Sequence, residues 1–256
     1  MPWNPEIYNR FKNIRYRPFF DLTELIQHEP SMKAVDLGCG TGEQTALLAE
    51  KFTDAVFYGI DSSGEMLEKS KVFENERLRF ERSTMEEIIA KNETWDLIFS
   101  NAALQWSDNH CELFPKLLSK LNSGGQVAIQ MPDQPRNNLN QLLAELAQEE
   151  PFRSYLNGWN RPSSVLLLDE YARLFFENGI GDLDLSLRVY PIIAETPDTL
   201  FDFISGSALI PYLEKLNREQ QQLFVKVFKE RISLAFPNFP ALYSFKRLLL
   251  YGRKKD

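Results

Sequence analysis

The chain has 256 residues and a formal net charge of −7 at pH 7. This length suffices for one domain with a large core, or for one domain that carries a sizeable insertion. The acidic balance argues against nucleic acid or an anionic membrane as a partner, since both favour a basic face. Two cysteines are too few for a disulfide framework, and the polar, proline-containing start is followed by no apolar stretch of membrane length. We therefore expect a cytoplasmic, monomeric protein.

Short apolar runs alternate with helical patterns over the first half of the chain. This alternation predicts a parallel sheet wrapped by helices on both faces. A helix is predicted over 62–72, because Ser62 and Glu65 have the spacing of a capping box. The predicted strands are 33–37, 55–60, 78–81, 95–100 and 126–131.

After Pro132 the pattern changes to prolines, aromatic residues and helical segments. Helices are predicted over 140–149 and 169–178, and a third begins at Thr196-Pro197 and ends near Gly206. The longest helical pattern is marked by Leu223, Phe224, Val227, Phe228 and Ile232.

Two further strand-like segments, 182–190 and 244–251, are expected to pair antiparallel at one edge of the sheet. The helices of 191–240 lie between them in the chain. We expect these helices, together with those of 133–180, to form a helical lid insertion that covers the ligand crevice at the carboxyl ends of the strands.

The most informative segment is 34–42, in which glycines at alternate positions (Gly38, Gly40 and Gly42) follow an apolar run. Without side chains there, a ligand can lie against the main chain and the start of the next helix. A dinucleotide fingerprint would place its third glycine at position 43, where Glu43 stands. The G-x-G-x-G spacing is typical of S-adenosylmethionine sites; a tight turn without a ligand is the alternative.

Two acidic residues accompany this loop. Asp61 ends the next strand, about twenty residues further on, where a carboxylate accepts hydrogen bonds from both ribose hydroxyls of a nucleoside; a helix cap is the alternative. Asp36 precedes the glycines, and either orients the loop or reaches the cofactor through water. Ser62 and Met66, just beyond Asp61, are further cofactor-binding candidates.

The next two strand ends supply the remaining cofactor candidates. An acid that receives the adenine amino group is expected where Thr84 stands, so Ser83, Thr84 and Met85 are candidates for a weaker acceptor. After the fourth strand, Asn101 is a candidate to bind the methionine ammonium, and Trp106 either packs in the core or lines the methyl-transfer pocket. Near the start of the chain, Trp3 and Tyr8 offer aromatic faces that suit a sulfonium cation.

Other kinds of site lack support. His28, His110, Cys39 and Cys111 do not have the spacing of metal ligands, so no metal is expected. No G-x-S-x-G segment occurs, and no Gly-Lys-Ser/Thr closes the glycine loop as it would in a phosphate loop.

Together these segments resemble the class I S-adenosylmethionine-dependent methyltransferases, and within them the trans-aconitate 2-methyltransferases. The similarity is good up to Pro132 and weaker beyond it. It implies a Rossmann-like α/β fold in a single domain (1–256), with a seven-stranded, mostly parallel sheet, an N-terminal helical cap (1–30) and a cofactor-binding core (31–132). The similar segments are Trp3-Asn4-Pro5 with Tyr8, Arg17-Pro18, the glycine loop, 59–63, 96–99, 104–106, 112–115 and 130–133, with weaker similarity at 220–224 and 245–247.

The resemblance implies that a small organic acid is methylated on a carboxylate oxygen. The family carries an arginine suited to a substrate carboxylate where this chain has Ile210. Other arginines, Arg136, Arg161 or Arg247, are candidates to replace it, with a solvated surface position as the alternative for each. We expect Tyr8, Trp106 and Arg247 to line the reaction site.

A carboxylate acceptor is ionised at neutral pH and needs no general base, so alignment and exclusion of water suffice for an in-line displacement. The lack of an obvious histidine or glutamate base argues mildly against phenols, hydroxyls and amines as acceptors. The alternatives are a malonyl-thioester carboxyl methyltransferase of biotin synthesis, another small-molecule methyltransferase, and a non-catalytic S-adenosylmethionine-binding protein.

Overall fold

The computed structural model of the chain describes residues 12–255, with side chains from Tyr16 onward. Trp3, Tyr8 and the first part of the predicted helical cap lie outside the described residues. The described chain divides into two compact units. The first, here called the sheet unit, contains 17–132, 164–188 and 247–255. The second, the helical unit, contains 12–16, 133–163 and 189–246.

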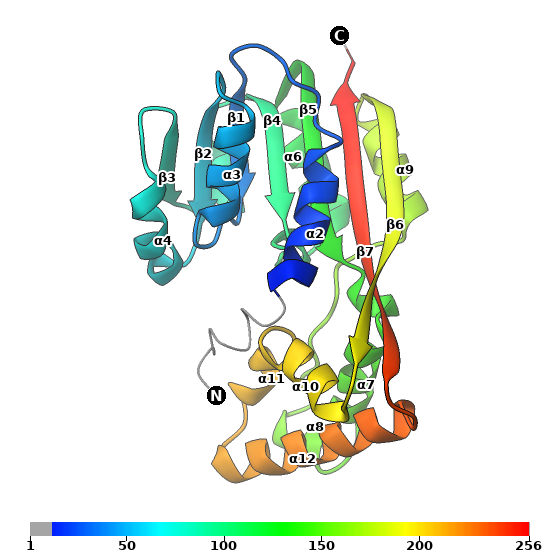
Figure 1. Ribbon diagram of the computed structural model, residues 1–256. Coiled ribbons are helices and arrows are strands. Elements are labelled where there is room, and N and C mark those ends of the chain that lie inside the picture. The colour runs from blue at the N-terminus through cyan, green and yellow to red at the C-terminus, as the bar shows by residue number, and fades with distance from the viewer. Residues whose placement is uncertain (1–11, 256) are drawn as a thin grey trace. The chain divides into compact units, whose positions relative to one another are not determined.

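The strands form one sheet in the order β3-β2-β1-β4-β5-β7-β6 (Figure 1). The first five are parallel, and β7 runs antiparallel to β5. The Gly179 carbonyl accepts from the Lys255 N–H at 2.9 Å, so the start of β6 lies beside the end of β7 and these neighbours are also antiparallel. Their bounds are β1 (Lys33–Leu37), β2 (Val56–Asp61), β3 (Leu78–Arg82), β4 (Trp95–Asn101), β5 (Leu121–Pro132), β6 (Ile180–Ala194) and β7 (Ala241–Lys254).

Every predicted strand is present, and the differences lie at strand ends. β5 begins at Leu121 rather than at Gln126, because Gly124 and Gly125 lie within the strand. The pairing register with β4 shifts between Trp95 and Leu97 at this point, so the two strands pair irregularly there. An added Cβ on Gly125 would lie 3.0 Å from two backbone oxygens, so a side chain there would require the neighbouring backbone to shift.

Helices cover both faces of the sheet. Figure 1 shows α2 (Lys12–Thr23) and α3 (Glu43–Lys51) in front, with α6 (His110–Ser119) and α9 (Leu168–Glu177) behind. Leu113, Phe114 and Leu117 of α6 share one apolar cluster with Tyr171 and Phe175 of α9 and with the strands. The predicted α/β fold class is therefore confirmed.

One predicted helix start is wrong. α4 (Gly64–Ser70) is capped by Ser63, whose Oγ accepts from the Met66 N–H at 3.3 Å, so Ser62 and Glu65 form no capping box. The reason lies in the preceding strand. Asp61 accepts a hydrogen bond from the Ser63 N–H at 2.8 Å, which keeps Ser62 outside the helix.

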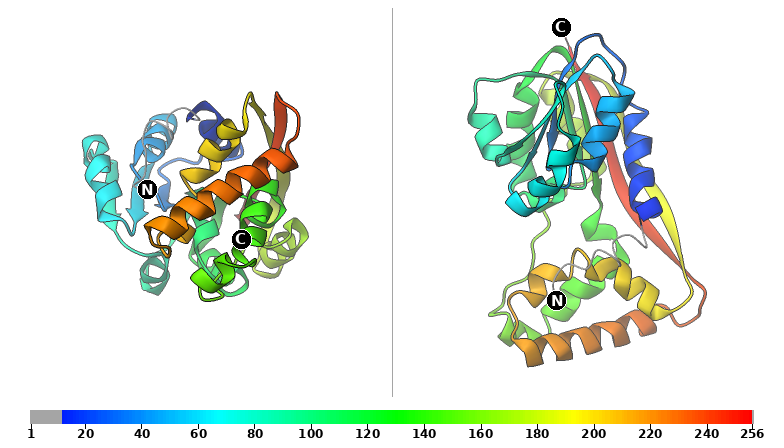
Figure 2. Two further views of the ribbon diagram at one scale, coloured as in Figure 1. Left: turned by 90° about the horizontal axis from the view of Figure 1, so that it is seen from below. Right: turned by 60° about the vertical axis from the view of Figure 1, so that its left-hand side comes forward.

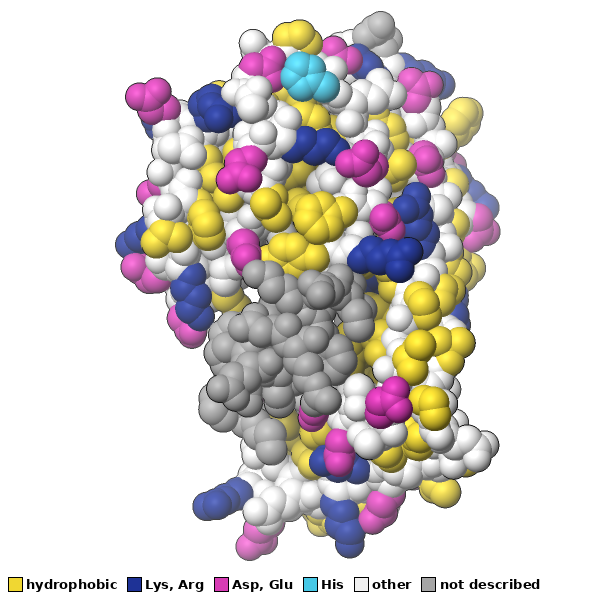
Figure 3. Space-filling model, viewed as in Figure 1, with side chains coloured by type: hydrophobic (Ala, Val, Ile, Leu, Met, Phe, Trp, Pro, Cys, Tyr) yellow, Lys and Arg dark blue, Asp and Glu magenta, His cyan; other side chains and the backbone are white. Residues whose placement is uncertain are grey.

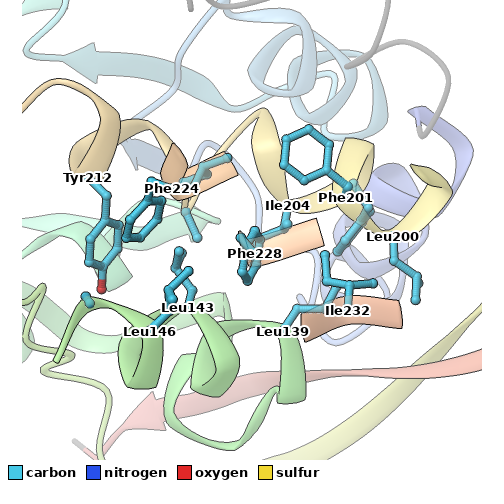
Figure 4. Close-up of a cluster of buried hydrophobic side chains, with 14 of the residues drawn as sticks. Leu139, Leu143, Leu146, Leu200, Phe201, Ile204, Tyr212, Phe224, Phe228 and Ile232 are labelled. Carbon is cyan, nitrogen blue, oxygen red and sulfur yellow. The ribbon is translucent and has the colours of Figure 1, made fainter. Parts of the chain in front are cut away.

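The helical unit has its own apolar core. Figure 2 shows α12 (Arg218–Ala235) beside α7 (Asn138–Ala147) and α10 (Pro197–Ser205), and short α8 (Phe152–Tyr155) and α11 (Ile210–Leu213) complete the unit. In Figure 4, leucines of α7 point toward Phe224, Phe228 and Ile232 of α12. The predicted helices over 140–149, 169–178 and 197–206 are confirmed within two residues. The helices α10–α12 lie between β6 and β7 in the chain, and their function as a lid stays a prediction.

Candidate functional site

Loops that follow β1, β2, β3 and β4 meet at the carboxyl edge of the sheet, within the sheet unit. The pairing register aligns Leu37 with Ile60, Asp61 with Arg82, and Asn101 with Gln130. In open α/β sheets, ligands bind outside the carboxyl ends of the strands. The residues predicted to hold a cofactor lie along this edge.

The three loop glycines differ in what surrounds them. Gly38, Gly40 and Gly42 all have positive φ, at 77°, 57° and 76°. A Cβ on Gly38 would lie 2.2 Å from that of Ala103, and one on Gly42 would lie 2.6 Å from the Phe80 ring. No heavy atom lies within 4 Å of the position of a Gly40 Cβ. Packing of the protein itself thus requires the outer glycines, whereas the central glycine borders open space.

The Asp61 carboxylate ties the glycine loop to the end of β2. Its Oδ2 accepts from the Gly40 N–H at 2.9 Å and its Oδ1 from the Ser63 N–H at 2.8 Å. Since Ser63 caps α4, the helix-cap interpretation of Asp61 is wrong. Each carboxylate oxygen retains acceptor capacity for a further donor, such as a ribose hydroxyl.

Asp36 is buried and holds α3 in place. Its Oδ2 accepts from the Thr45 hydroxyl at 2.6 Å. Burial raises the pKa of this carboxyl from 3.8 to about 7; the charge of Asp61 adds to the rise, and the Thr45 hydrogen bond opposes it. The hydrogen bond ties Asp36 to α3, and its two predicted roles, toward the loop and toward the cofactor, stay predictions.

Asn101, at the end of β4, has one satisfied and one unsatisfied side-chain atom. Its Nδ2 donates to Gln44 Oε1 at 2.8 Å. Its Oδ1 is buried and has no hydrogen-bond partner among the described residues. A buried acceptor of this kind is completed by a ligand or a water that donates. An ammonium group fits this requirement.

The candidates after β3 are engaged with α5 (Met85–Ala90). Thr84 caps this helix, because its Oγ1 accepts from the Glu87 N–H and its own N–H donates to Glu87. Ser83 Oγ donates to the same carboxylate at 3.1 Å, and Met85 Sδ accepts from Ser107 Oγ. Thr84 is thus a helix cap, and its predicted contact with adenine stays a prediction.

Ser62 and Met66 lie on either side of the α4 cap. Ser62 is exposed, and its carbonyl accepts from Arg82 Nε at 3.1 Å. Met66 is half-buried in the first turn of α4. Both are close to Asp61 in the chain, and their contacts with a cofactor stay predictions.

The segment after β4 holds Trp106 at the surface. Trp106 ends a single turn of 3₁₀ helix, η2 (Leu104–Trp106), and is 40% exposed, so it is not a core residue. His110 holds this turn through the Leu104 carbonyl. A role for His110 in the site was not predicted from the sequence. His110 Nε2 lies 2.9 Å from the Leu104 carbonyl, and its Nδ1 lies 2.5 Å from the Tyr171 hydroxyl.

Arg247 is buried at the same edge. It pairs with Pro132 in the register of β5 and β7, is 6% exposed, and donates from Nη1 to Gln130 Oε1 at 2.6 Å. A solvated surface position is therefore wrong for this arginine. The sequence also missed Gln130 as a residue of the site, because a glutamine within an apolar strand gives no signal by spacing.

The two other candidate arginines lie in the helical unit. Arg136 pairs with the buried Asp133 at 2.6 Å. Arg161 lines a cavity of about 120 Å³ together with Tyr212 and Ser163. Ile210, which stands where the resemblance implies an arginine, begins α11.

The described residues contain neither a metal-binding cluster nor a membrane-spanning helix. No group of three or more His, Cys, Asp or Glu side chains has the arrangement of a metal site there. Within the same part of the chain, no helix combines the length and the apolar character needed to span a bilayer. On the face in Figure 3, lysine and arginine side chains are interspersed with acidic ones.

Comparisons with known proteins identify relatives of this chain. Residues 28–179 match a family model described as "Methyltransferase domain". A protein of Deinococcus radiodurans named trans-aconitate 2-methyltransferase is 36% identical over the whole of both chains. An Escherichia coli protein of the same name is 31% identical over 99% of each chain.

A solved structure shows the same fold at lower identity. Phosphoethanolamine N-methyltransferase 2 of Haemonchus contortus, in complex with S-adenosyl-L-methionine, superposes with a TM-score of 0.57 at 17% identity. The match covers 94% of the present chain and 52% of that one.

Proposed function

Because the chain belongs to the class I S-adenosylmethionine-dependent methyltransferases, in the family of the trans-aconitate 2-methyltransferases, we propose that it methylates a carboxylate oxygen of a small organic acid. The cofactor is S-adenosylmethionine, which supplies a methyl group activated by its sulfonium charge. Methyl transfer to a small molecule is common to the family; the carboxylate acceptor is the proposed part.

The residues present fit this cofactor. The open space beside Gly40 leaves room for a ligand against the main chain. Asp61 is fixed by two backbone N–H groups and offers acceptors for ribose hydroxyls. The unsatisfied Asn101 Oδ1 offers an acceptor for an ammonium. In the proposed arrangement, Gly38, Gly42 and Asp36 shape the loop, and Ser62, Met66, Ser83, Thr84 and Met85 border the nucleoside.

The observation that carries the proposal is the burial of Arg247 at the same edge of the sheet. Arg247 is 6% exposed and donates from Nη1 to Gln130 Oε1, and a guanidinium with its five donors can also bind a carboxylate of a substrate at this edge. This arginine would compensate for Ile210. Trp106, exposed beside the same edge, is proposed to line the reaction site and to help exclude water.

The hydrogen bonds of His110 also support a methyl acceptor that needs no general base, because they leave this histidine without a free ring nitrogen. The Leu104 carbonyl only accepts, so His110 Nε2 carries the proton and Nδ1 accepts from Tyr171. Both ring nitrogens are thus engaged within the protein. A carboxylate, which is ionised at neutral pH, reacts without deprotonation.

The test is a transfer assay with purified protein and cofactor labelled in the methyl group. Di- and tricarboxylic acids are expected to become labelled in a product that mild base hydrolyses to methanol, as a methyl ester does. The panel includes phenols, amines and a malonyl thioester on an acyl carrier. Transfer only to phenols or amines would contradict the proposal, and transfer only to the thioester would favour the biotin-type reaction. Cofactor binding without turnover on any acceptor would indicate a binding protein.

A further inference from the structure

Gln130 occupies an unusual position in β5. Its side chain is fully buried. Its Oε1 accepts from Arg247 Nη1 at 2.6 Å, whereas its Nε2 is buried with no hydrogen-bond partner among the described residues. Buried amide groups are normally satisfied on both atoms, and an exception calls for a missing donor or acceptor.

The orientation of the Gln130 amide is fixed by chemistry. A guanidinium has only donors, so the atom of Gln130 that faces Arg247 must be the oxygen. The NH₂ group therefore points elsewhere, and rotation of the amide by 180° would place two donors against each other. The unsatisfied atom, Gln130 Nε2, is thus a hydrogen-bond donor. Its position is fixed because Oε1 of the same amide accepts from Arg247.

The neighbours of Gln130 belong to the candidate site. Gln130 pairs in the sheet register with Asn101, and Pro132, two residues further along β5, pairs with Arg247. The carboxyl edge therefore presents an unsatisfied donor on β5 next to a buried guanidinium on β7. An amide N–H beside a guanidinium is complementary to a carboxylate, which accepts from both.

We propose that Gln130 and Arg247 together bind a carboxylate of the acceptor acid. Gln130 Oε1 holds the guanidinium, and Gln130 Nε2 donates directly to the substrate, which makes Gln130 a specificity-determining residue. The inference rests on the proposed function. An oxygen held by a cation is a poor nucleophile, so the pair binds a carboxylate other than the one that is methylated. Acids with a single carboxyl group should therefore be poor substrates.

The main test compares Gln130→Glu and Gln130→Met with the unaltered protein. In Gln130→Glu the introduced carboxylate would neutralise Arg247 and repel the acid, so KM for a dicarboxylic acid such as succinate, or for tricarballylate, should rise at least ~30-fold. Gln130→Met keeps the size of the side chain but removes the donor, and a rise of about tenfold is expected. In both variants, the Kd of S-adenosylhomocysteine should stay within about twofold, because the pair does not contact the cofactor in this proposal.

A matched control lies in the same strand. Gln126 is also fully buried, but its amide is satisfied by Gln27 and Tyr251. Gln126→Met should lower stability without changing KM for the acid. If Gln126→Met and Gln130→Met raise KM equally, Gln130 acts only through packing and the inference fails.

A direct readout remains even if a variant folds poorly. In the complete protein with S-adenosylhomocysteine bound, the ¹⁵N–¹H signals of the Gln130 side chain, identified by their loss in Gln130→Met, should shift when tricarballylate is added. A shift on addition of the cofactor product alone, together with a weakened Kd for it, would assign the pair to the carboxylate of the cofactor and overturn the inference. If no acid is methylated, the proposed function fails; if acids are methylated but KM does not respond, only this inference fails.

Discussion

The sheet unit and the helical unit differ in how their buried polar groups are completed. The helical unit is filled by a continuous cluster of aliphatic and aromatic side chains from α7, α10 and α12. The sheet unit has a similar cluster, but its carboxyl edge also buries amides. Each of Asn101, Gln105 and Gln130 has one atom with no hydrogen-bond partner among the described residues. Such atoms are costly in a finished core and are expected where a ligand completes them. Among the side-chain amides of the described residues, those with an unpartnered buried atom thus lie at or just after the carboxyl ends of β4 and β5, beside the proposed cofactor site.

The largest expected effect breaks the apolar cluster of the helical unit. Phe228 is fully buried in α12, and Phe228→Ala should reduce the free energy of unfolding by about 4 kcal/mol through lost contacts and a cavity. Hydrogen exchange should show the loss of protection in α7 and α12 first. Leu234→Ala in the same helix is the control, since Leu234 is 80% exposed and its removal should change stability by less than about 0.5 kcal/mol. An equal loss of protection in β1 and β4 would show that the comparison between the units is wrong.

The next prediction compares two glycines of the loop, one required for packing of the protein and one proposed to border the cofactor. Gly38→Ala should destabilise the protein by about 3 kcal/mol, because the new Cβ would overlap that of Ala103 and φ is positive. Gly40→Ala meets no neighbour and should cost about 1 kcal/mol from its backbone conformation alone. Calorimetry should nevertheless show a Kd for S-adenosylmethionine at least tenfold weaker in Gly40→Ala. Normal cofactor binding by Gly40→Ala would contradict the placement of the cofactor beside this residue.

Much of the fold could be predicted because its signals are local. Short apolar runs, helix caps and glycines predicted every strand and the helices α7, α9, α10 and α12, whereas α3 and α6 were not predicted individually. The wrong predictions concern the ends of elements, where a distant or competing contact decides where a strand or helix begins. The fifth strand was predicted to begin at Gln126, but it begins at Leu121, and Gly124 and Gly125 lie within it where its register with β4 shifts. Ser62 suggested a cap, but Asp61 moves the helix start to Ser63.

Residues of the candidate site could be predicted only where a glycine in the backbone or the spacing of residues in the sequence indicates them. Gly40 and Asp61 follow from spacing. Gln130 and His110 could not be found, because their roles depend on Arg247 and Tyr171, which lie 117 and 61 residues away in the chain. The cytoplasmic location, the monomeric state and the contacts of Tyr8 stay predictions.

A smaller effect concerns His110, which is buried behind η2. Burial lowers the pKa of this imidazole below its usual 6.5. Hydrogen bonds with the backbone of Leu104 and Ser107, and the charge of Asp108, oppose this shift. The unfolded chain then binds a proton more readily than the folded one as the pH falls below 6.5. Stability is therefore complete above this pH and is lost as the pH falls toward the lowered value.

We therefore expect the free energy of unfolding to be lower at pH 5.5 than at pH 7.5, in part because of this histidine. Urea unfolding at the two pH values should show a smaller difference in His110→Asn than in the unaltered protein. An unchanged pH dependence in His110→Asn would contradict a neutral, buried imidazole.

The pKa shift of Asp36 has the opposite sign to that of His110. Since burial raises its pKa to about 7, the folded protein holds a proton that the unfolded chain releases near 3.8. Asp36 therefore lowers stability as the pH rises from about 4 through 7. Asp36→Asn keeps an acceptor for Thr45 and removes the buried charge, so its stability relative to the unaltered protein should be higher at pH 8 than at pH 5.

The same carboxylate should make cofactor binding depend on pH. S-adenosylmethionine carries a sulfonium charge that S-adenosylhomocysteine lacks, and an ionised Asp36 favours the cation. Between pH 8 and 6, as Asp36 takes up its proton, the Kd of S-adenosylmethionine should weaken by about threefold more than that of S-adenosylhomocysteine. Asp36→Asn should remove this difference while it binds both molecules. If the difference persists in the variant, another group at the carboxyl edge senses the sulfonium, and Asp36 serves only to fix α3 through Thr45.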